Sequence, residues 1–200
     1  KTLTGFKYIG EKIRQFENKE LDGTYLFGFE ESYGYLIGTH ARDKDGIMAV
    51  TGLCEAAAYY MDKGLTLWDQ MINIYEKYGY FKEGIYTMTL AGEDGAKRIN
   101  EILDNLRKNP PTELAGYKVV KTRDYANDIV KDLTTGETGT TGLPKSNVLY
   151  FDMTSDAWFC VRPSGTEPKI KFYAGIKGES LEDAEDKLNK VLTELKKLGN

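Results

Sequence analysis

The segment from Arg162 to Lys169 has the composition of a phosphate-binding loop. It reads Arg-Pro-Ser-Gly-Thr-Glu-Pro-Lys and lies between two apolar runs. Arg162 supplies a planar fork of hydrogen-bond donors, and Gly165 permits backbone conformations that are closed to other residues. Ser164 and Thr166 add hydroxyl groups. A loop of this composition can hold a phosphate group from several sides.

The charges around this loop also favour an anion. The whole chain has 27 Lys and Arg against 31 Asp and Glu, which gives a net charge of -4 and excludes a general attraction to nucleic acid or anionic lipid. Between residues 161 and 177, however, four cations face one acid, Glu167. These cations are Arg162, Lys169, Lys171 and Lys177. We therefore predict a local anion site; a Pro/Gly turn between two strands, with solvated lysines, is an equally weighted alternative.

A second polar group, Glu30, Glu31 and Ser32, forms a loop before Gly34. The loop follows an apolar run, 23–29, that we predict to be a buried strand, and ligands of open α/β sheets bind at the carboxyl ends of strands. A carboxylate can accept hydrogen bonds from two neighbouring hydroxyls, which suits a sugar diol. Consecutive side chains diverge, so we expect at most one of the two glutamates to face a given ligand. An acidic, solvated turn is the alternative.

Few residues of this chain are suited to hold a metal ion. Its one histidine, His40, excludes a Cys/His zinc cluster, while Cys54 and Cys160 lie in apolar runs that are typical of buried thiols. The pair Asp43 and Asp45 does not continue into an EF-hand, because a glycine comes too early and Cys54 occupies the place of the bidentate glutamate. We expect no metal site in these residues.

Apolar spacing and caps predict the helices that position these loops. The stretch 46–61 is apolar on nearly all sides, so we expect it to form a core helix. Capping-box patterns at Thr66 with Asp69, and at Ser180 with Asp183, mark the starts of two further helices. Helices are predicted at 6–16, 46–61, 66–78, 94–107 and from 180 onward.

Strands are predicted from short apolar runs bounded by turn residues. The Gly- and Thr-rich stretch 134–145 is predicted to be an exposed hairpin loop. Within and beyond it, residues 139–146 look like a P-loop, but Pro144 replaces the glycine before the lysine and no apolar strand precedes it. Besides 23–29, strands are predicted at 84–90, 117–122, 148–153, 157–161 and 169–176.

The order of these elements predicts the fold class. The first part reads as an α/β segment, and the rest as a small α+β domain with a mainly antiparallel sheet flanked by helices. We place the domains at residues 1–80 and 81–200, and expect the chain to begin inside a domain. No run approaches the roughly 18 apolar residues of a membrane span, and the first ten residues lack a signal peptide's apolar stretch. We therefore expect a cytoplasmic protein.

Three motifs together resemble the phosphohexomutase superfamily, in its bacterial phosphoglucomutase/phosphomannomutase branch. Their order and separation match those of the family over nearly the whole chain. They are Gly-Phe-Glu-Glu-Ser-Tyr-Gly at 28–34, Arg-Asp-Lys-Asp-Gly at 42–46 and Arg-Pro-Ser-Gly-Thr-Glu-Pro-Lys-Ile-Lys-Phe at 162–172. The resemblance implies that the first domain is the C-terminal part of domain 3, with its sugar-binding loop. It implies that the second is domain 4, with its phosphate-binding loop.

The resemblance also implies roles for single residues. Glu30, Glu31 and Ser32 are expected to contact sugar hydroxyls, with Glu31 favoured because it directly precedes the serine. Lys44 is expected to lie near the reacting hydroxyl as a catalytic residue. Lys7, in a Thr-Gly-Phe-Lys motif, is expected to contact the sugar. With the two lysines that follow the loop, the residues expected to hold the substrate phosphate are Arg162, Ser164, Gly165, Thr166, Lys169 and Lys171.

The implied reaction transfers a phosphoryl group between the 1- and 6-positions of a hexose phosphate. It uses a phosphoserine, Mg²⁺ and a hexose 1,6-bisphosphate that serves as intermediate and activator. The family's serine loop and its Asp-Gly-Asp-x-Asp-Arg-like metal loop do not occur in these 200 residues. The resemblance therefore implies an isomerase whose N-terminal domains are partners of this chain, and a chain that is inactive alone.

Two alternatives stay open on the sequence. A free-standing sugar-phosphate binding module would use the same loops without catalysis, and a phosphopentomutase would keep the fold and change the sugar. The sequence does not distinguish glucose from mannose, because a carboxylate that binds the 3- and 4-hydroxyls does not contact carbon 2.

Overall fold

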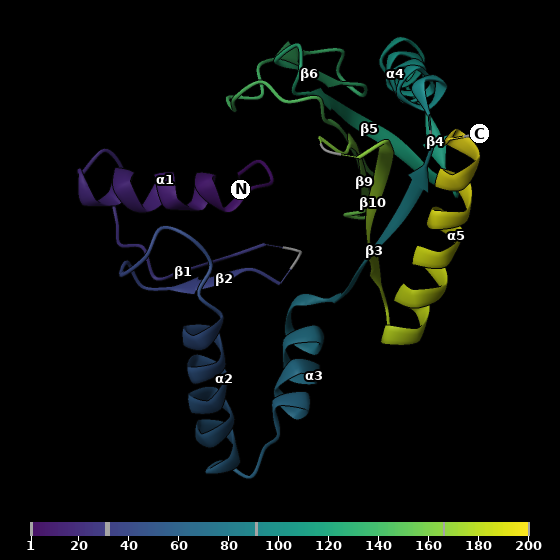
Figure 1. The fold of residues 1–200 in the computed structure, drawn as a ribbon. Coiled ribbons are helices and arrows are strands. Elements are labelled where there is room, and N and C mark those ends of the chain that lie inside the picture. The colour runs from purple at the N-terminus through teal and green to yellow at the C-terminus, as the bar shows by residue number, and fades with distance from the viewer. Residues whose placement is uncertain (1, 31–32, 91, 166, 200) are drawn as a thin grey trace. The chain divides into compact units, whose positions relative to one another are not determined.

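The computed structural model describes residues 2–30, 33–90, 92–165 and 167–199, with the side chain of Glu93 left out (Figure 1). Contacts divide the chain into two units, residues 1–74 and 75–200, each of which is described by itself. Within the described ranges, none of the helices is both long and apolar enough to cross a membrane.

The first unit is mainly helical, with one short hairpin. Its core is formed where Phe6, Ile9 and Ile13 of the first helix meet Leu36 of the hairpin, so the predicted amphipathic helix is confirmed. The Tyr25 hydroxyl donates to the Leu36 carbonyl at 3.1 Å and ties the preceding segment to this core. The elements are α1 Phe6–Glu17, β1 Phe27–Phe29, β2 Tyr35–Ile37, α2 Gly46–Met61 and α3 Leu67–Tyr78, the last of which runs across the division.

The predicted buried strand at 23–29 is wrong in two respects. Its strand part is limited to β1, which pairs antiparallel with β2 in a two-stranded sheet. Phe29 is 63% exposed, and its ring stacks with Tyr35 at 6.5 Å between centroids. The reason is that the described residues provide no further strand to extend or cover this hairpin.

Helix α2 has the predicted bounds but not the predicted burial. None of its residues is buried, and Ile47 is 83% and Met61 72% exposed. Cys54 on the same helix is also exposed, and Cys160 is half-buried, so neither thiol is buried as predicted. Periodicity determines that an apolar segment is helical, whereas burial depends on what packs against it.

The capping box that begins α3 is confirmed. The Thr66 backbone N–H donates to Asp69 Oδ2 at 2.8 Å, and the Asp69 N–H donates back to Thr66 Oγ1 at 3.1 Å. Hydrogen bonds from the Thr66 side chain and backbone lower the pKa of Asp69. The cap explains why the helix starts at Leu67.

The second unit is built on one antiparallel sheet. Its strand order is β3-β10-β9-β8-β5-β6-β7, with β4 paired to β5. The strands are β3 Tyr80–Thr89, β4 Glu113–Leu114, β5 Tyr117–Asp124, β6 Ile129–Asp132, β7 Thr138–Gly139, β8 Leu149–Met153, β9 Trp158–Pro163 and β10 Lys169–Gly178. The helices are α4 Glu93–Lys108 and α5 Leu181–Gly199. The fold is therefore an α/β segment followed by an α+β domain, as predicted.

Both helices of this unit cover the same face of the sheet (Figure 1). Alternate residues of the central strands bury large side chains there, among them Phe151, Phe159 and Phe172. The rings of Phe151 and Phe159 stack with centroids 4.3 Å apart. The opposite face, which we call the open face, carries the other set of side chains, including Arg162 and Tyr173.

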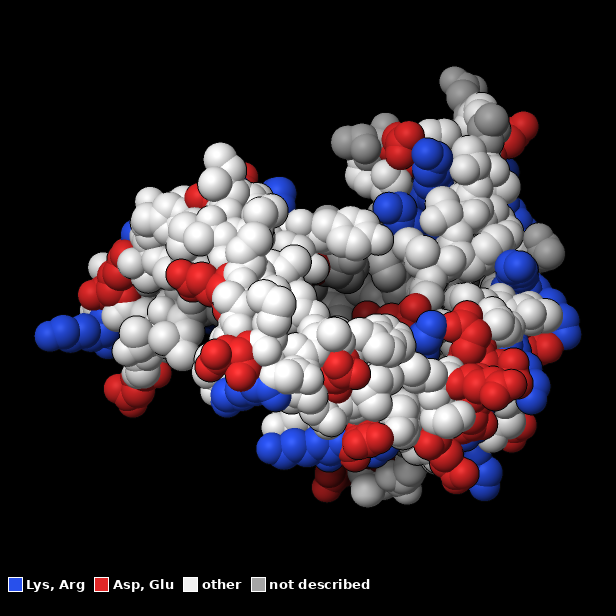
Figure 2. Space-filling view, turned by 90° about the horizontal axis from the view of Figure 1, so that it is seen from below, with Lys and Arg blue, Asp and Glu red and all other residues white. Residues whose placement is uncertain are grey.

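The predicted strands of this unit are found at their places, with ends that differ by a few residues. The short strands β4, β6 and β7 were not predicted, because segments of two to four residues are too short to show a clear alternating pattern. Strand β7 lies inside the predicted loop 134–145, so this loop is part of a hairpin with paired strands. Figure 2 shows that Lys and Arg side chains and Asp and Glu side chains are both present on the face in view.

Gly175 on the open face is required by the close approach of Trp158. An added Cβ would lie 2.2 Å from Trp158 Nε1, and the Trp158 ring also stacks with the ring of Tyr150, with centroids 5.3 Å apart. We expect Gly175→Ala to lower the free energy of unfolding by about 1–3 kcal/mol, measured by urea denaturation.

Gly139→Ala is the matched control for this substitution. Gly139 also lies in a strand, but a Cβ there would meet nothing within 4 Å. We expect its effect to stay within about 0.5 kcal/mol. Equal effects of the two substitutions would contradict the assigned role of the Trp158 ring.

Candidate functional site

The acidic loop of the first unit connects β1 to β2. The Glu30 N–H donates to the Gly34 carbonyl at 2.8 Å and closes the loop. Tyr33 has a positive φ of 63° and is 89% exposed. The predicted sugar-binding residues Glu31 and Ser32 lie outside the described residues.

The Glu30 carboxylate lies where three separate parts of the sequence meet. Its Oε1 accepts a hydrogen bond of 3.1 Å from the backbone N–H of Gly5, in the Thr-Gly-Phe-Lys motif. A Cβ on Gly34 would lie 3.0 Å from Glu30 Oε2 and 2.5 Å from Lys44 Cδ. Gly34 is therefore needed because Glu30 and Lys44 flank it closely. The structure brings these two predicted site residues together.

Lys44 is held as a cation at this place. Its Nζ donates to Asp43 Oδ1 at 2.9 Å and lies 5.4 Å from the centre of the Phe6 ring. The hydrogen bond to Asp43 raises the pKa of Lys44, and the negative charge of Glu30 acts in the same direction. Lys44 is therefore protonated at neutral pH and is suited to contact an anion, not to remove a proton.

Lys7 is the last residue of the same motif, but it lines a separate surface hollow. Its Nζ lies 4.9 Å from the centre of the Tyr8 ring. A surface hollow of about 590 Å³ is lined by Lys7, Tyr8, Gly10, Glu11, Arg14 and Arg42. Lys7 is thus close in sequence to Gly5, which contacts Glu30, but Lys7 has no contact with Glu30 or Lys44 among those described.

His40 and Asp45 serve the local structure of this unit. Asp45 Oδ1 accepts from the backbone N–H groups of Ile47 and Met48, at 2.9 and 3.0 Å, and caps α2. His40 Nε2 lies 2.9 Å from Asp45 Oδ2. The Met48 hydrogen bond, followed by that of His40, lowers the pKa of Asp45. Because its folded pKa is depressed, the stability that Asp45 adds is present above its unfolded pKa and is lost as the pH falls through the folded value.

The second predicted site is the turn between β9 and β10, and its strand–loop–strand prediction is confirmed. The Ser164 N–H donates to the Lys169 carbonyl at 2.7 Å, and the Glu167 N–H donates to Ser164 Oγ at 3.3 Å. Thr166 lies outside the described residues. Gly165 has no positive φ, and a Cβ there would meet nothing within 4 Å. The unusual backbone that the sequence suggested for this glycine is therefore not found.

Arg162 projects from the last part of β9. Its Nη2 donates to the Tyr173 hydroxyl at 3.1 Å, and its guanidinium carbon lies 5.8 Å from the centre of that ring. Its Nε is buried and has no hydrogen-bond partner among the described residues. A buried donor without an acceptor is costly, so it indicates a group that a bound molecule can satisfy.

The two predicted lysines differ in their surroundings. Lys171 stands directly opposite Arg162 in the β9–β10 register, so two cations share the open face. Lys169 Nζ donates to Glu167 Oε1 at 2.9 Å, and this pair is exposed. The positive charge of Lys169 is thus partly neutralised, whereas that of Lys171 has no acid within ion-pair distance in the described part of the chain.

A surface hollow of about 400 Å³ adjoins the turn between β9 and β10. It lies between the turn and α4. The residues that line it are Ala96, Ile99, Asn100, Pro163, Ser164, Gly165, Glu167 and Pro168. Ser164 and Gly165 are thus accessible to a small ligand from this side.

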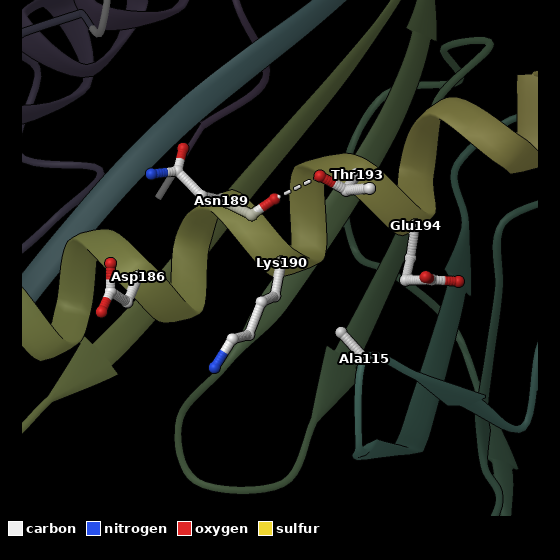
Figure 3. Close-up of a pocket in the computed structure, with 6 residues that line it drawn as sticks. All are labelled: Ala115, Asp186, Asn189, Lys190, Thr193 and Glu194. Carbon is white, nitrogen blue, oxygen red and sulfur yellow. Dashed lines mark hydrogen bonds between the residues drawn. The ribbon is translucent and has the colours of Figure 1, made fainter.

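A larger hollow, of about 610 Å³, contains none of the predicted site residues (Figure 3). Asp186, Lys190 and Glu194 of α5 contribute charges of both signs, so it has no preference for an anion. Thr193 Oγ1 donates to the Asn189 carbonyl at 2.8 Å within the helix. The lining residues are Ala115, Asp186, Asn189, Lys190, Thr193 and Glu194. We assign no ligand to it.

Among the described residues, no three His, Cys, Asp or Glu side chains gather in a way that could hold a metal ion. The described residues therefore offer nothing that fits the Mg²⁺ implied by the family resemblance.

Tyr173 and Gly5 contact predicted site residues but were not themselves predicted. Tyr173 could have been found, because alternation along β10 puts Lys169, Lys171 and Tyr173 on one face. The contact of Gly5 with Glu30 joins residues 25 positions apart, and no local pattern indicates it.

Comparison with known proteins identifies both units. Residues 1–78 match the family model described as "Phosphoglucomutase/phosphomannomutase, alpha/beta/alpha domain III". Residues 99–188 match the model described as "Phosphoglucomutase/phosphomannomutase, C-terminal domain". Together the two matches cover both predicted loops.

Curated relatives and a solved structure add to this comparison. Phosphoglucomutase from Staphylococcus aureus strain USA300 is 38% identical over 192 residues, and that from strain N315 is 37% identical. Each alignment covers 95% of this chain and 34% of the relative, so the chain spans about a third of their length. The crystal structure of the di-domain ARO/CYC BexL from the BE-7585A biosynthetic pathway reaches a TM-score of 0.35 at 10% identity, over 74% of this chain and 57% of that one. That value is too low to support an argument.

The order of the two domains, the three motifs and the identity over nearly all of the chain agree. This chain belongs to the phosphoglucomutase/phosphomannomutase family, of which it contains domain III and C-terminal domain sequences.

Proposed function

We propose that this chain is the substrate-recognition part of a phosphoglucomutase/phosphomannomutase, with domains at residues 1–80 and 81–200. In the complete polypeptide, this isomerase interconverts hexose 1-phosphate and hexose 6-phosphate through a phosphoserine and a bisphosphate intermediate. The observation that carries the proposal is Arg162, which stands opposite Lys171 and has a buried Nε without a partner among the described residues.

A bound phosphate group would relieve both unfavourable features of Arg162, the opposing charge of Lys171 and the unpaired buried donor. Like charges directly opposite each other on neighbouring strands repel, and a buried unpaired donor costs free energy. A phosphate bound on the open face, over Arg162 of β9 and Lys171 of β10, neutralises the two cations and accepts charge-assisted hydrogen bonds from the guanidinium. Ser164, Gly165 and Thr166 of the turn then complete the phosphate site, with Lys169 at its edge.

In the first unit we assign the sugar hydroxyls to the loop of Glu30, Glu31 and Ser32. Because Glu30 Oε1 already accepts from the Gly5 N–H, Glu30 anchors the loop, and Glu31 with Ser32 makes the main sugar contacts. Lys7 contributes from the adjoining motif. Lys44, as a cation beside Glu30, stabilises negative charge near the reacting hydroxyl. One diol-binding loop and one phosphate loop thus serve both orientations of the bisphosphate.

The transfer step itself belongs to other parts of the complete polypeptide. There, Mg²⁺ held by residues outside this chain would neutralise charge on the transferring phosphoryl group. The active serine and the metal ligands are assigned to N-terminal domains outside this chain, so this chain alone is inactive. Its residues bind and orient the hexose phosphate, in keeping with a cytoplasmic enzyme of carbohydrate metabolism.

Titration of the chain with glucose 1,6-bisphosphate tests the phosphate site. We expect the amide NMR signals of Ser164 and Gly165 to shift, with a Kd around millimolar or weaker because the sugar and phosphate loops lie on separate units. Signals from the hairpin at 134–139 serve as an internal control and are expected to stay in place. Unchanged signals at Ser164 and Gly165 at saturating ligand would contradict the proposal.

A further inference from the structure

The hydroxyl of Tyr173 accepts a hydrogen bond from the Arg162 guanidinium. On β10, Tyr173 follows Lys171 by two residues, so both side chains lie on the open face. Tyr173 is directly opposite Cys160, which makes it the diagonal neighbour of Arg162 on β9. This placement lets the Arg162 guanidinium reach the phenol oxygen at 3.1 Å.

The Tyr173 side chain makes two kinds of contact with Arg162. The phenol oxygen accepts from Nη2, and the aromatic ring lies 5.8 Å from the guanidinium carbon. A free arginine side chain has many rotamers, and ordering it costs affinity when a ligand binds. Tyr173 imposes that order before the ligand arrives.

A phenol is well suited to this task because it is a neutral acceptor. A carboxylate at the same place would neutralise the guanidinium and compete with an incoming anion. The phenol engages one of the five guanidinium N–H groups, and the buried Nε keeps no described partner. The guanidinium is thus oriented without losing its charge.

We propose that Tyr173 is a positioning residue that holds the Arg162 guanidinium ready for the substrate phosphate. This inference rests on the proposed function, since it concerns the same phosphate site. It adds Tyr173, a residue of β10 outside the motif at 162–169, to the determinants of phosphate affinity.

Steady-state kinetics of the complete polypeptide test this role. Tyr173→Phe keeps the ring and removes the acceptor, so we expect KM for the hexose phosphate to rise about threefold to tenfold. We expect kcat to change less than twofold, because a phosphate contact held throughout the reaction affects ground state and transition state alike. Tyr86→Phe is the matched control, since Tyr86 stacks on Phe172 on the helix-covered face.

A double-mutant cycle separates positioning from a general structural effect. In an Arg162→Ala background, Tyr173→Phe is expected to have no further effect on KM. An additive rise in KM in that background, or an unchanged KM in the single variant, would overturn the role of Tyr173. If Arg162→Ala itself leaves KM and kcat/KM unchanged, the proposed function fails instead.

Discussion

In the complete polypeptide, Arg162→Ala is expected to lower kcat/KM for hexose phosphate by one to two orders of magnitude. The substitution removes charge-assisted hydrogen bonds worth about 1.5–3 kcal/mol, and each 1.4 kcal/mol corresponds to a factor of ten. It also leaves Lys171 as the one cation of the pair across β9 and β10. Initial rates measured over a range of substrate concentrations give the comparison.

Two further variants show whether charge or geometry is responsible. Arg162→Lys keeps the positive charge but loses the planar fork, so we expect an intermediate loss of kcat/KM. Lys131→Ala removes an exposed cation from β6 of the same sheet and is expected to leave the kinetics unchanged. If Lys131→Ala and Arg162→Ala reduce kcat/KM equally, the effect comes from net charge, and Arg162 has no special place in the site.

The local elements that hold these loops follow from the sequence because short-range interactions determine them. The capping box of Thr66 and Asp69 is a contact over three residues, and it places the start of α3 correctly. Strands β9 and β10 are apolar at alternate positions, so the segment between them had to be a turn.

Features that depend on partners distant in the sequence could not be predicted in the same way. The register that sets Arg162 opposite Lys171 and near Tyr173 is decided by the whole sheet. Gly165 permits an unusual backbone, but a Ser/Gly/Pro turn forms here without one, since the φ of Gly165 is not in the left-handed region. The exposed apolar side chains of α2 are the largest departure, since their pattern is that of a core helix.

The apolar side chains of α2 and α3 are expected to be buried in the complete polypeptide. The family model that matches residues 1–78 is described as an alpha/beta/alpha domain. The described strands of the first unit, however, are only those of the short hairpin β1–β2. The chain also spans about a third of its relatives. We expect further strands of the same domain, in the complete polypeptide, to cover Val50, Leu53 and Trp68, which are 61%, 59% and 63% exposed here.

Val50→Asp distinguishes an exposed from a covered α2. Valine and aspartate have similar helix propensities, so the change mainly reports the surroundings of the side chain. In the complete polypeptide we expect it to lower the free energy of unfolding by about 3 kcal/mol or more, because it removes apolar burial and buries an unpaired carboxylate. In the present chain alone, where Val50 is exposed, we expect a change within about 0.5 kcal/mol. Urea denaturation followed by circular dichroism measures both.

The decisive quantity is the difference between the two changes in unfolding free energy, one in the complete polypeptide and one in this chain. Any intrinsic effect of Val50→Asp on α2 cancels in this difference. Glu55→Ala on the same helix replaces an exposed carboxylate and is expected to change stability little at either length. The dye ANS, which binds exposed apolar surface, should fluoresce with this chain and much less with the complete polypeptide. A small effect of Val50→Asp at both lengths would show that α2 stays exposed. The apolar pattern of residues 46–61 would then require a partner outside this polypeptide.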